Sequence, residues 1–289
     1  GALSIRVACT AGDADRAERD IRGVADRVES WAHRLSRFDA TSDLSVLNAE
    51  PGMAIIPLRP TIAAVLSHAR DMELRTEGTV DVSMLDERLV AETGDRLGQA
   101  PRRRWSIDGC GRRCSLIRSA SSRFDLDGVA KGWIADRALR LLDAYPSALV
   151  DADGDVAIRS SSTAGWSIAV AHPEDDVGEL ARLRAPRGWS GDSFGVATSG
   201  TSVHRWHGRH GLSHHLIDPA TRRPAVTDVV QATVVAASTG LAEALAKSAV
   251  IRGSHDGFGL LHRAGAWGAL LLLEDGELLA TPGTARWLA

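Results

Sequence analysis

The chain has 289 residues, of which 44% are hydrophobic and 25% are charged, so it can bury a large core and is neither disordered nor a coiled coil. Its net charge of −3 creates no field that would attract nucleic acid or an anionic membrane, and no apolar run reaches the roughly 18 residues of a membrane span. We therefore expect no nucleic-acid partner and no membrane span.

The first part of the chain alternates extended segments with amphipathic helices. In chain order we expect a strand, a long helix, a polar turn-rich segment, a second helix, and an extended piece leading into a short helix, at residues 4–10, 13–36, 37–52, 59–78 and 79–94. Pro60 lies near the first turn of the second helix and Gly78 just past its end, the usual positions of these residues at helix termini.

The second part contains more strands. We expect a hairpin at 104–118, a strand that stops at Asp127-Gly128 before a helix at 123–144, and four short strands at 147–160, 165–173, 179–185 and 193–200. A further strand at 229–238, a helix at 239–252, another short helix and a last hairpin at 268–281 follow. Strands in antiparallel groups with helices between them predict an α+β fold rather than a doubly wound one. No low-complexity linker divides the chain, so residues 1–289 are expected to form one domain.

Lysine is rare in this chain and therefore informative. Lys and Arg total 34, and lysine occurs only as Lys131 and Lys247, which leaves 34 − 2 = 32 arginines. An exposed salt bridge works as well with arginine, so a retained lysine indicates a place that needs a compact ammonium group. The alternative is that Lys247 pairs with Glu243, at i and i+4 on a helix, in a surface salt bridge of about 0.2–0.5 kcal/mol.

Two segments carry features of an anion site. In "FDLDGVAKGW", small residues stand at a strand-to-helix turn, where free backbone N–H groups favour phosphate, and Lys131 follows directly. In "FGVATSGTSVHRW", Thr198, Ser199 and Gly200 follow an apolar strand and offer hydroxyls and bare backbone, although an ordinary turn is the alternative.

A third segment, "HHLIDPATRRPA", carries a candidate base. His215 and Asp218 are three residues apart, and histidine is the side chain best suited to take a proton from a hydroxyl near neutral pH. His214 is expected to point to the other face of an extended segment, into solvent.

Together, and in this order, seven stretches resemble the successive motifs of the ApbE family, the FAD:protein FMN transferases. They are "SDLSVLNA", "GTVDVSM", "DLDGVAKGWIAD", "DADGDVAI", "ATSGTSVHR", "HLIDPATRRPA" and "VVAASTGLAEALAKSAVIRG". The resemblance implies a T-fold-like α+β architecture, FAD as a ligand, dependence on Mg²⁺, and transfer of FMN from FAD to a threonine or serine of an acceptor protein with loss of AMP.

The resemblance also implies roles for individual residues. His215 corresponds to the base and Asp218 to its neighbour, while the flavin and phosphate contacts correspond to Ser45, Asn48, Asp81, Gly128, Lys131, Thr198, Ser199, Gly200 and Lys247. We expect the FAD diphosphate between "DGVAKG" and the start of the helix at 239–252, because both offer backbone N–H groups. The metal ligands correspond to the backbone carbonyl of Ala130 and to the side chains of Glu243 and Lys247.

Several of these positions depart from the family pattern. An ammonium has no lone pair, so Lys247 cannot coordinate Mg²⁺, and we expect the site to keep a positive charge without the metal. Asp127, Asp153 and Asp155 add carboxylates that would repel a diphosphate, and Arg222 replaces a glycine.

Three hypotheses follow for function. The first is an FAD:protein FMN transferase. The second is a metal-independent FAD-binding or FAD-hydrolysing relative that has lost transfer, and the third is a scaffold without a ligand. The compartment is left open because the chain starts at Gly1 rather than Met and shows no signal peptide. A cytoplasmic location is expected only if the chain is complete.

Overall fold

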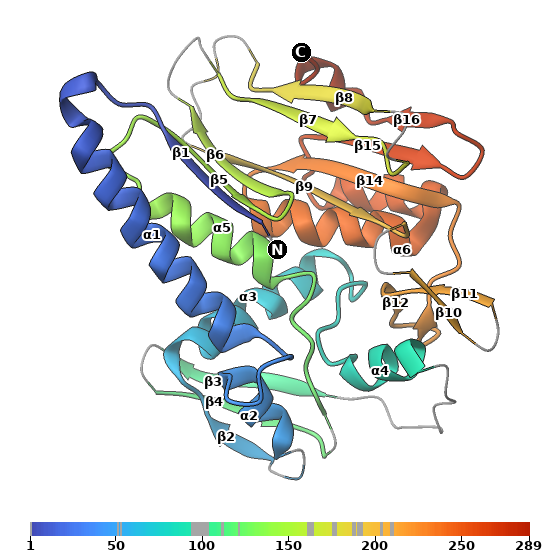
Figure 1. Cartoon of the computed structure of the whole chain (residues 1–289). Coiled ribbons are helices and arrows are strands. Elements are labelled where there is room, and N and C mark those ends of the chain that lie inside the picture. The colour runs from blue at the N-terminus through green and yellow to red at the C-terminus, as the bar shows by residue number, and fades with distance from the viewer. Residues whose placement is uncertain are drawn as a thin grey trace.

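The computed structural model describes residues 2–289 except 51, 53, 94–103, 111–112, 121, 161–164, 175–177, 187–188, 190–192, 203–204 and 209–210. Its centre is a seven-stranded sheet in which all neighbouring strands are antiparallel, in the order β1-β5-β6-β9-β14-β15-β16 (Figure 1). In that order the strands are Leu3–Val7, Ser147–Ala152, Asp155–Ser160, Phe194–Gly200, Val229–Ala236, Gly268–Leu273 and Leu278–Ala280. The predicted α+β class with mainly antiparallel sheets is confirmed.

Helices cover one face of this sheet. Helix α6 (Thr239–Arg263) lies along β9 and β14, α5 (Ala130–Arg140) lies along β5 and β6, and α1 (Ala14–Leu35) packs on α5 (Figure 1). The first turns of α6 are rich in fully buried alanines, which let the helix approach the strands closely. A kink at Gly253, where φ is 76°, separates the helix expected over 239–252 from the short helix expected after it.

The other face of the sheet carries a second, aromatic core beneath the hairpin of β7 (Ser167–Ala171) and β8 (Glu179–Arg184). Trp267 and Trp287 stack there with their ring centroids 5.9 Å apart, and Trp287 is fully buried. Because the sheet is covered on both faces, its central strands are apolar on both sides instead of alternating.

A second group of elements lies below α5 and α6 in Figure 1. It consists of a three-stranded sheet with α2 and α3, and of α4 beside two small hairpins. The elements are α2 Asp43–Ala49, β2 Ile55–Pro57, α3 Pro60–Arg75, α4 Leu85–Thr93, β3 Trp105–Cys110, β4 Arg113–Arg118, β10 Arg205–Gly208, β11 Gly211–His214, β12 Ile217–Asp218 and β13 Arg223–Pro224. Short 3-10 helices at Ala11–Asp13 and Pro282–Arg286 complete the chain.

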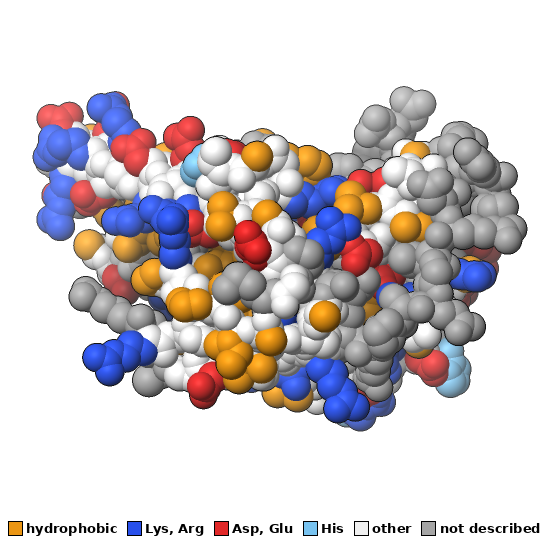
Figure 2. All heavy atoms as spheres, turned by 90° about the horizontal axis from the view of Figure 1, so that it is seen from below, with side chains coloured by type: hydrophobic (Ala, Val, Ile, Leu, Met, Phe, Trp, Pro, Cys, Tyr) orange, Lys and Arg blue, Asp and Glu red, His pale blue; other side chains and the backbone are white. Residues whose placement is uncertain are grey.

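The surface of this lower group mixes residue types. Basic and acidic side chains are interspersed with hydrophobic ones on the face seen from below (Figure 2). Phe38, Val46, Ile55 and Leu74 are among the exposed large hydrophobic residues. Among the described residues, none of the helices has the length and apolar character needed to cross a membrane.

Two sequence predictions for the lower group are corrected. The polar segment 37–52 contains a seven-residue helix, α2, whose N-cap Ser42 accepts a hydrogen bond from the Ser45 N–H at 2.9 Å. The segment 123–126 is not a strand, because its backbone bonds the Asn48 side chain and the Val82 carbonyl, and residue 82 lies in a turn. The Asn48 side chain accepts from Phe124 N–H and donates to the Phe124 carbonyl, both at 2.8 Å.

A third correction concerns residues 147–160, which form two strands instead of one. Asp153 and Gly154 both adopt positive φ, 59° and 92°, and these angles close a two-residue hairpin between β5 and β6. The sequence "ADGD" contains the Asp-Gly pair that favours such a turn.

The contact between β9 and α6 depends on a missing side chain. A Cβ at Gly195 would lie 2.2 Å from the backbone N of Thr239, which cannot yield as a side chain would. We expect Gly195→Ala to destabilise the fold by at least about 1–3 kcal/mol, as overpacking does. Gly23→Ala is the control, since nothing lies within 4 Å of a Cβ there, and it should stabilise α1 by about 0.5–1 kcal/mol. Urea denaturation measures the free energy of unfolding of both variants. Equal changes in the two would contradict the close contact at Gly195.

His68, on α3, predicts a pH dependence of stability. Burial lowers its pKa from 6.5 to about 4, with Asp71 opposing the shift and Arg137 adding to it. The folded state therefore binds fewer protons than the unfolded state between pH 6.5 and 4, and stability falls on acidification through this window, by up to about 3 kcal/mol. His68→Leu should flatten the pH dependence, whereas His255→Leu, which changes a fully exposed side chain, should not. An unchanged slope in His68→Leu would contradict the assignment.

Candidate active site

A narrow cleft beside α4 brings together residues from several distant segments. It is lined by Thr79, Asp81, Met84, Arg88, Asp125, Asp127, His215, Ile217 and Lys247. Its enclosed volume of about 30 Å³ is room for about one water molecule. Of the predicted site residues, the cleft joins Asp81, His215 and Lys247.

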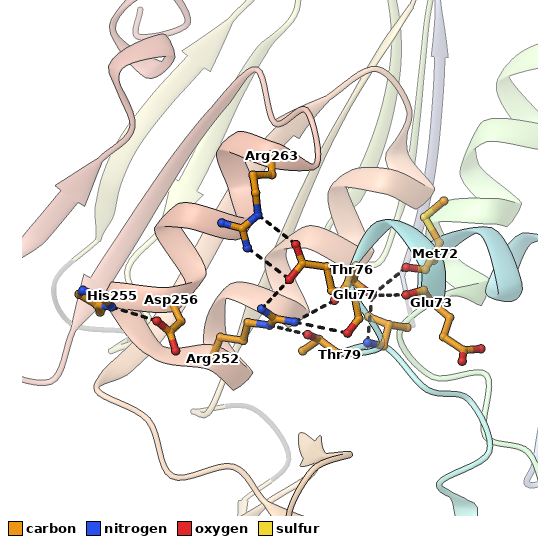
Figure 3. Close-up of polar contacts among 10 residues, drawn as sticks. Met72, Glu73, Thr76, Glu77, Thr79, Arg252, His255, Asp256 and Arg263 are labelled. Carbon is orange, nitrogen blue, oxygen red and sulfur yellow. Dashed lines mark hydrogen bonds and ion pairs between the residues drawn. The ribbon is translucent and has the colours of Figure 1, made fainter.

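The segment that carries Asp81 is held from α6. Arg252, just before the kink, donates to Thr79 Oγ1 at 2.6 Å and pairs with Glu77 at 3.0 Å, and Arg263 pairs with the same carboxylate at 3.0 Å (Figure 3). These ion pairs lower the pKa of Glu77, first through Arg263. One wall of the cleft is thereby tied to α6, the helix that carries Lys247.

Lys247 faces the turn before α5. Its Nζ donates to the Asp127 carbonyl at 2.7 Å, and its side chain fills the space over Gly128, where a Cβ would lie 2.3 Å from Nζ. The carbonyl at this position is that of Asp127, three residues before the expected Ala130. No ion pair joins Lys247 to Glu243 in the described part of the chain, and Glu243 is only 5% exposed, so the surface salt bridge is ruled out.

Arg88, on α4, is a cleft residue that sequence reasoning missed. Its guanidinium contacts the Asp127 carboxylate at 3.3 Å and the His215 carbonyl at 3.2 Å, and it pairs with Glu92 at 2.8 Å. Partial burial raises the pKa of Asp127, but attraction to Lys247 and then Arg88 lowers it to about 2. The expected repulsive charge at Asp127 is therefore matched by two cations.

The starts of α5 and α6 cap each other, which overturns the expected diphosphate position. Glu243 of α6 accepts from the Gly132 N–H at 2.8 Å, and Asp136 of α5 accepts from the Thr239 and Gly240 N–H groups at 2.8 and 3.0 Å. Because these N–H groups are buried and bonded within the protein, the start of α6 is not available to an anion.

Lys131 is surrounded by acidic residues, and two of them, Glu243 and Asp127, also interact with Lys247. Lys131 Nζ lies 3.4 Å from the buried Asp155 carboxylate, whose pKa burial raises to about 6 although Lys131 opposes the shift. Asp153 accepts from the Ala2 N–H at 3.1 Å in the hairpin turn. Burial, and then Asp155, raise the pKa of Glu243 well above its usual value, and its Oε1 has no hydrogen-bond partner.

His215 is half-buried in the cleft. The side chains of Asp218 and His214 instead make hydrogen bonds within the surrounding loop. The Asp218 carboxylate accepts from the Ala220 N–H at 2.9 Å and does not line the cleft. His214 is not solvated as expected, because its Nε2 bonds the Ala225 carbonyl at 3.0 Å. Arg222 adopts a positive φ of 58°, where the family glycine is expected, and its guanidinium Nε donates to the buried Glu87 at 2.7 Å.

Ser45 and Asn48 line a second, larger cavity of about 270 Å³, which α4 also borders. Arg37, Ala49, Leu85, Leu89 and Arg123 complete its lining. Asn48 is also bonded to the Phe124 backbone, so its side chain has a structural partner. Helix α4 thus contributes Arg88 to an ionic cleft and Leu85 and Leu89 to a more apolar cavity.

Thr198, Ser199 and Gly200 lie at the end of β9 and line neither cavity. Thr198 Oγ1 lies 2.8 Å from Thr233 Oγ1 on β14, in a cross-strand hydroxyl pair. β9 is an interior strand, but β6 pairs only with Phe194–Val196, so the last residues of β9 are bonded on the β14 side alone.

This cleft, with a histidine beside a lysine and an arginine on an antiparallel α+β scaffold, is suited to an enzyme that holds an anionic group and moves a proton. The model of the ApbE family matches residues 3–271, and the chain belongs to this family.

Known proteins of this family resemble the chain in sequence and in fold. An FAD:protein FMN transferase of Salmonella typhimurium is 23% identical, covering 98% of this chain and 84% of that protein. One of Treponema pallidum is 31% identical over 58% of this chain, which spans about half (48%) of that relative. The solved ApbE protein of Thermotoga maritima superposes with a TM-score of 0.79 at 21% identity, covering 99% of this chain and 96% of that one. The flavin transferase ApbE of Vibrio cholerae gives 0.75 at 20%, covering 99% and 95%.

Proposed function

We propose that this protein is an FAD:protein FMN transferase that acts as a single domain over residues 1–289. The main support is that His215, Lys247 and Arg88 line one cleft in a chain that belongs to the ApbE family. The Salmonella relative, which aligns over nearly the whole chain, bears this name.

In the proposed reaction, the hydroxyl of a threonine or serine of the acceptor protein attacks the FMN-side phosphorus of FAD. A phosphoester bond forms, the bond between the two phosphates breaks, AMP leaves, and the hydroxyl proton passes to His215. The protein contributes mainly positioning and positive charge, as in other phosphoryl transfers. Lys247 and Arg88 supply that charge on either side of Asp127.

The cavities suggest how FAD lies. The ionic cleft holds about one water, so we place the diphosphate across its mouth, against Lys247 and Arg88, and not at the start of α6. The larger cavity, lined by Ser45, Asn48 and Leu89, has the volume and apolar wall for part of the flavin. Asp81 stands at the cleft, where its carboxylate accepts from Ser83.

Mg²⁺, which the family resemblance implies, does not fit the residues present. The Asp127 carbonyl that faces the site already accepts from an ammonium group, and Lys247 supplies no lone pair. No step of the proposed reaction is therefore assigned to a metal.

Loss of transfer, the second hypothesis, is not favoured over this function. His215 remains in the cleft beside two cations, and the curated relatives are transferases by name. Ser45, Asn48 and Asp81 keep their place near the cavities, whereas Thr198, Ser199 and Gly200 act as structural residues of β9 in this proposal.

The proposal is tested with FAD and a protein extract that supplies acceptors. At about 100 times the dissociation constant, FAD should stabilise the fold by about 2.7 kcal/mol. With the extract, AMP should be released and a flavin-fluorescent band should survive denaturing electrophoresis. The absence of any thermal shift and of any labelled band at saturating FAD would refute the proposal.

A further inference from the structure

Lys247 occupies a position where a charged residue is unusual. It lies in the first half of α6, and its neighbours from 239 to 246 and from 248 to 251 are all buried. Almost every other cation of the chain is an arginine. A lysine retained in such a helix indicates a pocket shaped for a small cationic head.

The backbone around Lys247 is built to receive that head. Gly128 adopts φ 111°, which side-chain-bearing residues rarely adopt, and a Cβ there would lie 2.3 Å from Nζ and 2.8 Å from Cδ of Lys247. The ammonium donates to the Asp127 carbonyl at 2.7 Å. A backbone carbonyl directed at a cation over a bare glycine is the arrangement that a bound ion would also require.

The charges around Lys247 complete this arrangement. The charge of Lys247 acts on Asp125, Asp127 and Glu243 and favours their ionised forms. Burial nevertheless raises the pKa of Asp125 and of Glu243, and only the pKa of Asp127 is lowered, to about 2. Glu243 is 5% exposed, and its Oε1 has no hydrogen-bond partner. The ammonium therefore shares with Arg88 and Lys131 the role of compensating cation for a group of carboxylates.

A divalent ion cannot share this space with the ammonium. Two unit charges 4 Å apart repel by about 4 kcal/mol at an effective dielectric constant of 20, and a divalent ion would double this. Within the described residues, no group of three or more His, Cys, Asp or Glu side chains is arranged to hold a metal.

We infer that the Lys247 ammonium is the built-in cation of this site and replaces the divalent ion, so that the diphosphate of the substrate is held without metal. This inference rests on the proposed function, because it identifies which cation the substrate meets. It also applies to the protein without FAD, because the wild-type site should bind no divalent ion even then.

Binding of Mn²⁺ to the protein without FAD tests this, and electron paramagnetic resonance measures it. Wild type and Lys247→Arg should show no site at micromolar Mn²⁺, because both keep a positive charge in the pocket. Lys247→Thr offers a hydroxyl oxygen in place of the charge and should gain one site. A single Mn²⁺ site of micromolar affinity in the wild type would overturn the inference, whatever FAD does.

FAD binding, followed by flavin fluorescence, gives the second readout. EDTA should change wild-type affinity less than twofold, whereas Lys247→Thr should lose about tenfold or more in EDTA and recover with Mg²⁺. Lys247→Arg should weaken binding under both conditions, because the planar guanidinium does not fit a pocket sized for an ammonium. Wild-type binding that EDTA abolishes would overturn the inference and leave the proposed function standing. If no FAD bound under any condition, the proposed function would fail, and the Mn²⁺ result would still decide the inference.

Discussion

Replacing His215 with alanine should lower the rate of FMN transfer by about 10²–10⁴-fold, the usual loss for a general base. FAD affinity should change less than threefold, because a base acts on the hydroxyl proton and not on the ground-state diphosphate. The fold should be kept, since Arg88 bonds the backbone carbonyl of residue 215, which alanine retains. Rates of AMP release and FAD titrations measure the two effects separately.

Imidazole rescue distinguishes a catalytic role of His215 from a structural one. Added imidazole should restore part of the transfer rate of His215→Ala, because it can take the proton in the vacated space. His214→Ala is the neighbouring control, since that side chain bonds the Ala225 carbonyl and should affect stability more than rate. Full turnover in His215→Ala would show that the histidine is kept for structure only.

The sequence predicted most of the long elements because each has a strong periodic pattern. Helix α1 and helix α3 were expected within one to three residues of their observed ends, and the last hairpin turns at Gly276, where φ is 85°. Short elements were missed where a single contact decides the structure. Helix α2 depends on the Ser42 cap, and segment 123–126 is held by the Asn48 side chain from far along the chain.

The candidate site was predictable only where residue type itself was unusual. Two lysines among 34 cations drew attention to Lys247, and a histidine next to an Asp-Pro turn drew attention to His215. Arg88 could not be singled out, because it is one of 32 arginines and only folding brings it to Asp127 and His215. The sequence could not show that the N–H groups at the start of α6 are bonded, because their partner Asp136 lies about 100 positions earlier, on α5.

Gly128→Ala should lower FAD affinity by about tenfold or more. The new Cβ would lie 2.3 Å from Lys247 Nζ, so the flexible lysine side chain must move and its bond to the Asp127 carbonyl must break. The displaced ammonium would then no longer contact the diphosphate in the proposed position. A hydrogen bond to a charged group contributes about 1.5–3 kcal/mol, and each 1.4 kcal/mol corresponds to about tenfold in affinity. Fluorescence titration with FAD measures this loss.

The same substitution also strains the backbone, and a second glycine separates the two effects. At φ 111°, alanine should cost about 1–3 kcal/mol of folding stability. Gly276→Ala, at φ 85° with nothing within 4 Å of its Cβ, carries such strain without touching the cleft, so it should lower stability and leave FAD affinity unchanged.

The coupling between Gly128 and Lys247 is the decisive measurement. In a Lys247→Ala background the ammonium is already gone, so Gly128→Ala should add little further loss of affinity, and the two changes should be strongly non-additive. Additive losses would mean that Gly128 acts on FAD directly. Wild-type affinity in Gly128→Ala would mean that the ammonium reaches the ligand from another position, and that its bond to the Asp127 carbonyl has no part in binding.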